Sequence, residues 1–423
     1  MSELRVLADA PWLKSGPAAR VLALLNDDGE EARVVGGAVR NALLKIPPGD
    51  LDIATTALPD EVARRAKAAS IKCVPTGIAH GTVTLVVDSE PVEVTTLRED
   101  TETFGRKATV AFGRDWVRDA ERRDFTINGL SVDADGRVHD HVGGLADIAA
   151  RRVRFIGDAG QRIAEDYLRI LRFFRMHAVY GVGEIDRAGY LACIGGRAGL
   201  ASLSAERVRM EMLKIMVAEG ALVAVTAMGD GCLLQGILGG VTYNGPLAAM
   251  ILAEQVLGLT PGPVRRLGAL TVAVTEDATR IAARLRLTNA EAKALDSMGH
   301  RWWRLADMDA AKARRRLYRL GEDRYRDRLL LAWARSGGSQ NVADNHATYW
   351  REFATLPQRW AAPKFPLKAA DFMARGIAEG PALGHVLKLA EDAWLAADFP
   401  LDPSALSAIA DDTVVRFTRD HRL

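Results

Sequence analysis

Two short segments near the N-terminus carry residues whose types and spacing suit phosphate chemistry. Gly36 and Gly37 lie between a predicted strand and a predicted helix, and Arg40 falls on the first turn of that helix. A Gly-Gly turn there lets backbone N–H groups approach an anion at the helix N-terminus. An arginine on the first turn can add a bidentate contact to phosphate oxygens. The segment therefore predicts a phosphate-binding turn.

Asp50 and Asp52 follow this turn in the sequence Gly-Asp-Leu-Asp-Ile-Ala-Thr. We expect a strand over Asp50–Ala54, which would direct both carboxylates to the same face. Such a pair can hold two divalent ions that activate an attacking hydroxyl and stabilise a leaving pyrophosphate. Oxygen ligands beside a triphosphate indicate Mg²⁺. Glu93 lies in the predicted strand Val92–Leu97 and is a candidate third carboxylate. The sequence leaves open whether its side chain faces the two aspartates.

Neither segment is specific alone, since a lone Gly-Gly is usually a turn and a lone Asp-x-Asp usually a solvated strand end. A third segment, Arg122–Asn128, alternates charged and apolar residues and is predicted to be a strand edge facing a cleft. Arg123 would meet phosphates there, and Asp124 or Asn128 a ribose hydroxyl. The alternative is a surface cluster of ion pairs.

A fourth segment, Glu165–Arg175, is predicted to be one helix on which Asp166, Arg169 and Arg172 recur every third residue and share a face. Cytosine and adenine both present an amino donor beside an unprotonated ring nitrogen. A carboxylate and a guanidinium placed together would accept these bases and reject uracil and guanine. The alternative is a salt bridge on a solvated face.

The elements that must position these residues fall into two classes. Residues 1–150 mix helical and strand-like patterns, with a hairpin turn predicted at Asp135-Gly136. From about Arg162 helical periodicity continues to the C-terminus. The predicted helices and strands of the first part are Gly16–Leu25, Ala32–Val35, Val39–Leu44, Asp50–Ala54, Gly81–Val87 and Val92–Leu97.

Composition restricts the class of protein further. The chain has 423 residues, 48% hydrophobic and 26% charged, with a net charge of +2, so any nucleic-acid surface must be a local patch. The three cysteines form no CxxC pair, which argues against a disulfide framework or a thiolate zinc site. No signal-like or membrane-spanning apolar stretch is present, and we expect a cytoplasmic protein.

Taken together, the motifs resemble the class II tRNA nucleotidyltransferases, which are the bacterial-type CCA-adding enzymes, and their relatives the bacterial poly(A) polymerases. The resemblance covers about residues 30–215. The segments that carry it, in the order and spacing of the family, are GGAVRN, GDLDIAT, TGIAHGTVTL, EVTTLRED, RRDFTIN, EDYLRILRFFR and SAERVRME.

The resemblance implies a polymerase-β-like α/β nucleotidyltransferase head followed by an all-helical neck, body and tail. The expected ranges are 1–150, 151–220, 221–340 and 341–423. The implied activity is addition of C, C and A to the 3′ end of tRNA from CTP and ATP. The implied roles are Mg²⁺ binding and catalysis by Asp50 and Asp52, triphosphate binding by Gly37, Arg40 and Arg123, base recognition by Asp166 and Arg169, and further nucleotide binding by Arg172 and Arg175.

Several alternatives share these motifs. They are poly(A) addition, A-only or CC-only addition, and an inactive RNA-binding protein on the same fold. The segment around His80 favours the CCA-adding form. Two residues depart from the family pattern: Asn41 replaces a common Asp, and Phe104 replaces an Asp in a loop implicated in switching from C to A.

The C-terminal half carries no recognisable catalytic motif. A basic run is the candidate for contacts with the acceptor stem and T arm of tRNA, although such a run is more often a solvated helix face. It consists of Lys312, Arg314, Arg315, Arg316, Arg319, Arg324, Arg326 and Arg328. The tryptophans of this half are expected to fill helical cores.

Overall fold

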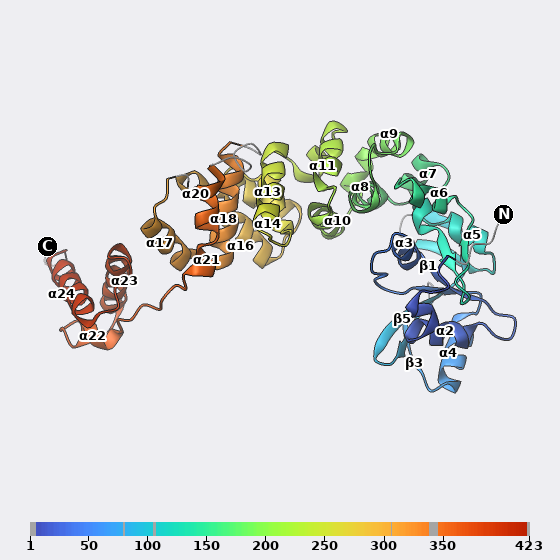
Figure 1. Cartoon of the computed structure of the whole chain (residues 1–423), viewed down its shortest axis with the longest axis horizontal. Coiled ribbons are helices and arrows are strands. Elements are labelled where there is room, and N and C mark those ends of the chain that lie inside the picture. The colour runs from blue at the N-terminus through green and yellow to red at the C-terminus, as the bar shows by residue number, and fades with distance from the viewer. Residues whose placement is uncertain (1–5, 79–80, 105–106, 306, 338–345, 421–423) are drawn as a thin grey trace. The chain divides into compact units, whose positions relative to one another are not determined.

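The structure is a computed structural model that describes residues 6–78, 81–104, 107–305, 307–337 and 346–420, without the side chains of residues 99–111 and 346. It divides into two compact units, Met1–Gly239 and Gly240–Leu423 (Figure 1). The finer division into head, neck, body and tail stays a prediction. His80 lies outside the described residues, and so does the side chain of Phe104.

The first unit begins with a mixed seven-stranded sheet in the order β3-β4-β5-β2-β1-β8-β9. All neighbouring strands are antiparallel except β2 and β5, which run parallel. A separate hairpin is formed by β6 and β7. The strands are β1 (Ala32–Val35), β2 (Ile53–Thr55), β3 (Lys72–Gly77), β4 (Thr82–Val87), β5 (Glu90–Thr96), β6 (Arg98–Phe104), β7 (Lys107–Phe112), β8 (Leu130–Val132) and β9 (Val138–Asp140).

Helices α2, α3 and α4 pack on this sheet. Helix α2 (Pro17–Leu25) buries Val21, Leu22 and Leu25 against β1 and β5, and α4 (Pro59–Ala68) packs on β3 and β4. Helix α3 (Gly37–Leu43) follows β1 directly and contacts β1 and β8. The predicted α/β head is therefore confirmed.

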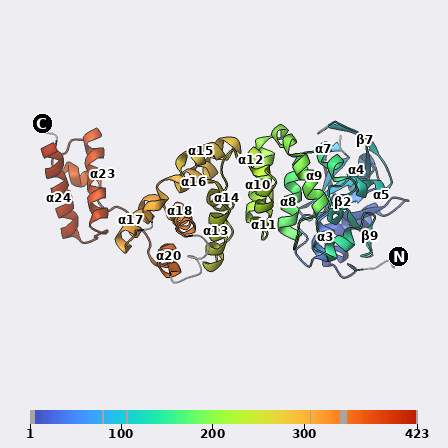
Figure 2. The ribbon, with the colours of Figure 1, turned by 90° about the horizontal axis from the view of Figure 1, so that it is seen from above.

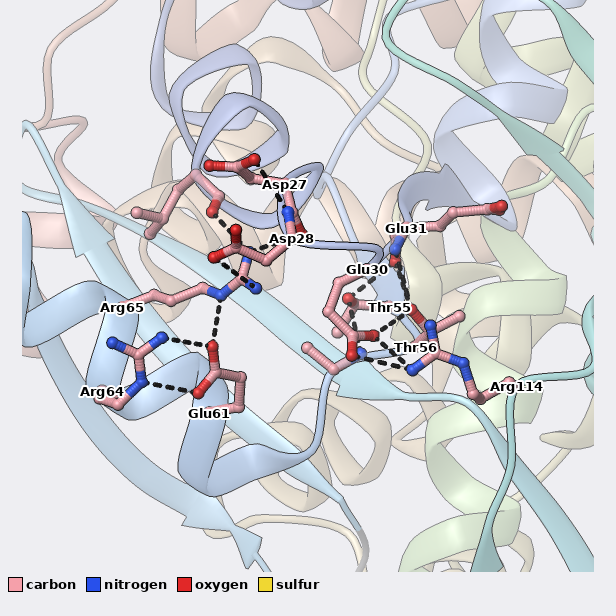
Figure 3. Close-up of polar contacts among 12 residues, drawn as sticks. Asp27, Asp28, Glu30, Glu31, Thr55, Thr56, Glu61, Arg64, Arg65 and Arg114 are labelled. Atoms are coloured by element: carbon pink, nitrogen blue, oxygen red, sulfur yellow. Dashed lines mark hydrogen bonds and ion pairs between the residues drawn. The ribbon is translucent and has the colours of Figure 1, made fainter.

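A polar network fixes the register of β1 against β2 (Figure 3). The Thr55 hydroxyl donates to the Glu31 carbonyl at 2.8 Å, and the Glu31 amide donates to the Thr56 hydroxyl at 2.8 Å. Arg114 donates to Glu30 at 2.8 Å, and Glu30 also accepts from Thr56. This register places Val35, at the end of β1, beside the residue that precedes β2.

An all-helical part follows β9 within the same unit (Figure 2). Its central helix α8 (Leu168–Tyr180) packs on α10 and α11, and Phe173 and Phe174 are fully buried. The Phe173 ring stacks on Phe155 at 5.2 Å, and Phe155 lies 4.9 Å from Phe125 in the head. The other elements are α6 (Gly144–Ala149), α7 (Ala159–Glu165), α9 (Arg187–Gly195), the 3₁₀ helix Arg197–Ser202, α10 (Ala205–Val217), α11 (Ala221–Asp230) and α12 (Leu233–Leu238).

The described part of the second unit is helical. Its main helices are α13 (Asn244–Val256), α14 (Pro263–Thr271), α15 (Thr275–Arg284), α16 (Asn289–Gly299), α17 (Ala310–Leu320), α18 (Glu322–Arg335), α20 (His346–Ala354), α23 (Pro381–Ala396) and α24 (Pro403–Asp420). Trp333, Trp350 and Trp394 are buried as predicted, whereas Trp303 is 50% exposed. Within the described ranges, none of the helices combines the length with the apolar composition that a membrane span requires.

Much of the predicted basic run is paired within the chain. Arg314 pairs with Asp398, and Arg319 lies 2.6 Å from Asp392. Arg326 pairs with Glu322. These contacts favour an internal role for part of the run, and its contact with RNA stays a prediction.

Gly136 in the β8–β9 hairpin gives a test of this fold. Its φ is +79°, and an added Cβ would lie 2.2 Å from the backbone nitrogen of Ala8. We expect Gly136→Ala to lower the free energy of unfolding by more than about 2 kcal/mol in denaturant titrations. Gly183, at φ +76° with no atom near its missing Cβ, is the control, and Gly183→Ala should cost only about 1 kcal/mol. Equal losses would contradict the packing of the N-terminal segment on this hairpin.

Candidate active site

One cavity of about 900 Å³ in the first unit collects the predicted site residues from helices α3 and α8 and from the loops that hold Asp50, Asp52, Arg123 and Asp166. Its lining includes Gly37, Arg40, Asp50, Asp52, Arg123, Asp166, Arg169, Arg172 and Arg175. It also includes residues for which the sequence assigned no role, among them Tyr180, Arg207 and Lys214. The structure thus brings all nine residues together, while their individual roles stay predictions.

The turn after β1 has the geometry that the glycines predict. Gly36 has φ +70°, and its amide donates to the Leu130 carbonyl at 3.0 Å. A Cβ at Gly36 would lie 3.1 Å from Nη1 of Arg123. Glycine therefore lets the Arg123 guanidinium lie against the turn, beside the first residue of α3.

Arg40 is held almost entirely inside the protein, with 7% of its surface exposed. Its Nη2 donates to the Asn41 side chain at 2.9 Å and to the Tyr180 hydroxyl at 2.7 Å. Its Nη1 donates to the side chain of Asn128. Burial lowers the pKa of Arg40, although the nearby Tyr180 and Asp124 oppose that effect. All its hydrogen-bond partners in the described part of the chain are uncharged.

The two aspartates do not lie on a strand, which corrects the prediction of a strand over Asp50–Ala54. Strand β2 begins at Ile53, because Pro47-Pro48 and Gly49, at φ +72°, keep the preceding segment out of the sheet. The Asp52 carbonyl still accepts from the Val35 amide at 2.9 Å. Both carboxylates reach the cavity from a loop that β1 and β2 fix at one end.

Negative charge is crowded around Asp52. Solvent reaches Asp52 through the cavity, yet partial burial raises the pKa of its carboxyl. The negative charges of Glu93 and Asp50 raise this pKa further, and the positive charge of Arg123 lowers it. Ile53 pairs with Val94 in the parallel register of β2 and β5, so Asp52 and Glu93 are adjacent. A divalent ion would relieve this crowding of negative charge.

The donor set fits a divalent ion in its chemistry, since hard carboxylate oxygens are the ligands that Mg²⁺ prefers. Among the described residues, however, no three acidic, histidine or cysteine side chains converge as a ready-made metal cluster. Asp50 and Asp52 are the pair on the cavity wall, and Glu93 lines a smaller cavity shared with Asp52. Further ligands would have to come from substrate or water.

The segment Arg122–Asn128 is not a strand edge, contrary to the sequence prediction. Helix α5 (Trp116–Glu121), capped by Asp115, ends at Arg122, and a 3₁₀ turn spans Thr126–Asn128. The Asp115 side chain accepts from backbone amides of the first turn of α5 and so stabilises this helix immediately before the segment. The predicted side chains still face the cavity.

Asp124 connects the head to α8. It accepts from Nε of Arg172 at 2.7 Å, from the Asn128 side chain at 3.0 Å and from the Phe125 amide at 2.9 Å. Burial alone would raise the pKa of Asp124, but Arg172 and these hydrogen bonds hold it below the ordinary value. Since Asn128 also contacts Arg40, one chain of polar contacts runs from α3 to α8.

The predicted helix over Glu165–Arg175 is interrupted at Asp166. Helix α7 ends at Glu165 and α8 begins at Leu168, because Asp166 has extended backbone and its carboxylate accepts from the Leu168 amide at 3.0 Å. The Asp166 carboxylate pairs with Arg207 at 2.7 Å, and Arg169 pairs with Glu165. The expected alternative, a salt bridge between Asp166 and Arg169, is not the contact that forms.

The cavity as a whole is basic. Its lining contains eight Arg and Lys side chains against four Asp. Such an excess favours a polyanionic ligand such as a triphosphate. Arg207 lies in the SAERVRME motif, but the sequence predicted no role for it. Tyr180 lies in none of the motifs.

A mixed-sheet head with an aspartate pair and a basic cavity, followed by helices, defines a nucleotidyltransferase. Residues 32–154 match the sequence model described as "Poly A polymerase head domain". The chain is 32% identical to "CCA tRNA nucleotidyltransferase 1, mitochondrial" of Mus musculus over 90% of this chain and 87% of that protein. It is 30% identical to the "CCA-adding enzyme" of Limosilactobacillus fermentum over 88% and 90% of the two chains.

Solved structures of CCA-adding enzymes have the same fold as this chain. The Bacillus stearothermophilus CCA-adding enzyme in complex with CTP superposes with a TM-score of 0.71 at 25% identity, covering 97% of this chain and 99% of that one. The Thermotoga maritima CCA-adding enzyme complexed with tRNA shares the fold at a TM-score of 0.67 and 19% identity, over 96% and 97% of the chains. The chain belongs to the CCA-adding tRNA nucleotidyltransferase family.

The Asp124–Arg172 contact is testable through its pH dependence. We expect Asp124→Asn to lower the free energy of unfolding by about 1–3 kcal/mol at pH 7, because Arg172 loses its charged partner while partly buried. A carboxyl with a lowered pKa stabilises the fold above its ordinary value of 3.8, and this contribution is lost as the pH falls through the folded-state value.

The measurement is denaturant unfolding of wild type and variant from pH 7 to pH 3, where the difference between them should shrink below about pH 4. Asp115→Asn is the matched control, since Asn also caps a helix well. A loss from Asp124→Asn no larger than that of the control would contradict the proposed connection.

Proposed function

We propose that this chain adds C, C and A in succession to the 3′ end of tRNA, from CTP and ATP and without a nucleic-acid template, releasing pyrophosphate. The observation that carries the proposal is the single cavity that unites the Asp50/Asp52 loop of the sheet with Asp166 and Arg169 of the helical part. Transfer chemistry and base choice can therefore act on one bound nucleotide.

In the proposed mechanism Arg40 and Arg123 bind the triphosphate, and the Gly36-Gly37 turn lets its oxygens approach the backbone. Asp50 and Asp52 would hold divalent ions, with Mg²⁺ as the ion that we propose. When bound, these ions would activate the RNA 3′-hydroxyl for attack on the α-phosphate and neutralise the pyrophosphate. The basic lining of the cavity orients the triphosphate for that attack.

Base choice is assigned to Asp166 and Arg169. The carboxylate accepts from the exocyclic amino group of C or A, and the guanidinium donates to the unprotonated ring nitrogen. Arg207 and Glu165 contact these two side chains and fix their positions. Uracil and guanine would present a carbonyl to a carboxylate, which is repulsive.

The names of the relatives support tRNA as the acceptor, and the second unit is proposed to contact its acceptor stem and T arm. Poly(A) addition, or addition of only A or only CC, is the alternative that the shared head domain leaves open. The relatives named above are mitochondrial and bacterial proteins, and a cytoplasmic location for this chain stays a prediction.

Replacement of Asp52 tests the catalytic role proposed for the aspartate pair. We expect Asp52→Ala to reduce nucleotide incorporation into tRNA by at least about 10³-fold while NTP binding stays measurable, because ion binding is lost and Arg40 and Arg123 remain. A chelator should inactivate the wild type, and added Mg²⁺ should restore it. Asp88→Ala, at an exposed turn of the same head, should retain full activity. Retained turnover by Asp52→Ala would refute the metal-binding assignment.

Loss of Asp166 tests base recognition. We expect Asp166→Ala to incorporate UTP or GTP that the wild type excludes, with a smaller change in triphosphate binding, because only the acceptor for the amino group is removed. The measurement compares incorporation of each single labelled NTP. Glu184→Ala, an exposed acid following α8, is the control. Continued exclusion of UTP and GTP by Asp166→Ala would show that other residues choose the base.

A further inference from the structure

We propose that Tyr180 is a positioning residue for nucleotide binding, which orients the Arg40 guanidinium toward the triphosphate. This inference rests on the proposed transfer function and names a residue that no motif marks. Tyr180 is the last residue of α8, while Arg40 lies on α3 of the head. Both line the same cavity.

The Arg40 and Tyr180 side chains contact each other through two interactions, a cation–π contact and a hydrogen bond. The Arg40 guanidinium carbon lies 3.9 Å from the centre of the Tyr180 ring, and Nη2 donates to the Tyr180 hydroxyl at 2.7 Å. The aromatic face attracts the cation, and the hydroxyl fixes its rotation. A phenylalanine could provide only the first interaction, and an aliphatic residue neither.

The remaining partners of Arg40 explain why such a contact matters here. Asn41 and Asn128 accept its other hydrogen bonds through neutral amide oxygens. Among the described residues no carboxylate forms an ion pair with Arg40, so its full positive charge remains available to a phosphate. Because neutral partners restrain it more weakly than a carboxylate would, the stack on Tyr180 supplies orientation without neutralising the charge.

Tyr180 also lies on the same helix as Arg169, one of the two residues proposed to recognise the base. Arg172, two turns earlier on α8, contacts Asp124, which connects through Asn128 to Arg40. Arg40 is thus positioned by α8 along two routes, one polar and one aromatic. A shift of α8 relative to α3 would move the guanidinium away from its place beside the Gly36-Gly37 turn.

The test compares Tyr180→Phe and Tyr180→Leu with wild type in steady-state incorporation of CTP and ATP into tRNA. We expect KM for both nucleotides to rise roughly 3- to 30-fold in Tyr180→Leu and less in Tyr180→Phe, with a smaller change in kcat. Exclusion of UTP and GTP should be unchanged, because Tyr180 does not contact Asp166 or Arg169. A merely structural role would not separate KM from kcat in this way.

Two further measurements separate this inference from the proposed function. Inorganic tripolyphosphate, which has no base or sugar, should bind Tyr180→Leu more weakly than wild type in calorimetry. In an Arg40→Ala background, Tyr180→Leu should have little additional effect, since the residue through which it acts is absent. Tyr190→Leu is the control for helix packing, because Tyr190 donates to the Ala227 carbonyl away from the cavity.

Unchanged KM and tripolyphosphate affinity in Tyr180→Leu, in the presence of normal wild-type activity, would overturn the role of Tyr180 and leave the proposed function standing. An equal effect with and without Arg40 would also overturn it. A wild-type protein that incorporates no nucleotide would instead refute the proposed function, while tripolyphosphate binding would still test the contact between Tyr180 and Arg40.

Discussion

The attachment of α8 to the head is the constraint on which the site depends. The aspartate pair and the Gly36-Gly37 turn belong to the head, whereas Asp166 and Arg169, the residues proposed to recognise the base, lie just before α8 and at its start. Asp124 pairs with Arg172, and the rings of Phe125, Phe155 and Phe173 form a continuous aromatic contact across the same boundary. In the proposed mechanism that attachment is what brings Asp166 to the base of a nucleotide whose phosphates lie at the Gly36-Gly37 turn.

Ion pairs within the chain explain why so many arginines can share one cavity. Several of them have a defined acidic partner: Arg172 pairs with Asp124, Arg175 with Glu211 and Arg207 with Asp166. These contacts hold the side chains apart and in place. Arg40 differs, because its partners are neutral and one of them is the ring of Tyr180. The cavity therefore combines fixed, paired cations with a cation whose charge is left for the ligand.

The sequence was sufficient for the α/β head and the helical remainder, because glycine turns, alternating strands and helical periodicity are local signals. The full set of residues that meet in the cavity followed from the resemblance to the nucleotidyltransferase family rather than from those signals. The sequence predicted local geometry less well. Asp50 precedes its strand, Asp166 interrupts its helix, and Asp124 lies in a turn. In each case a proline pair or an aspartate that accepts from backbone amides overrides the apolar pattern. The contact between Tyr180 and Arg40 joins residues far apart in the chain, so no local signal could reveal it.

The length and composition of the product would distinguish CCA addition from every alternative activity. Purified protein would be incubated with Mg²⁺ and labelled CTP, ATP or both, on tRNAs that lack their last three, two or one nucleotides, with an unstructured RNA as control. We expect addition of two C and one A to the first tRNA, completion of the others to the same end, and no extension of the unstructured RNA. Long A tails on both kinds of RNA, or no incorporation at all, would contradict CCA addition.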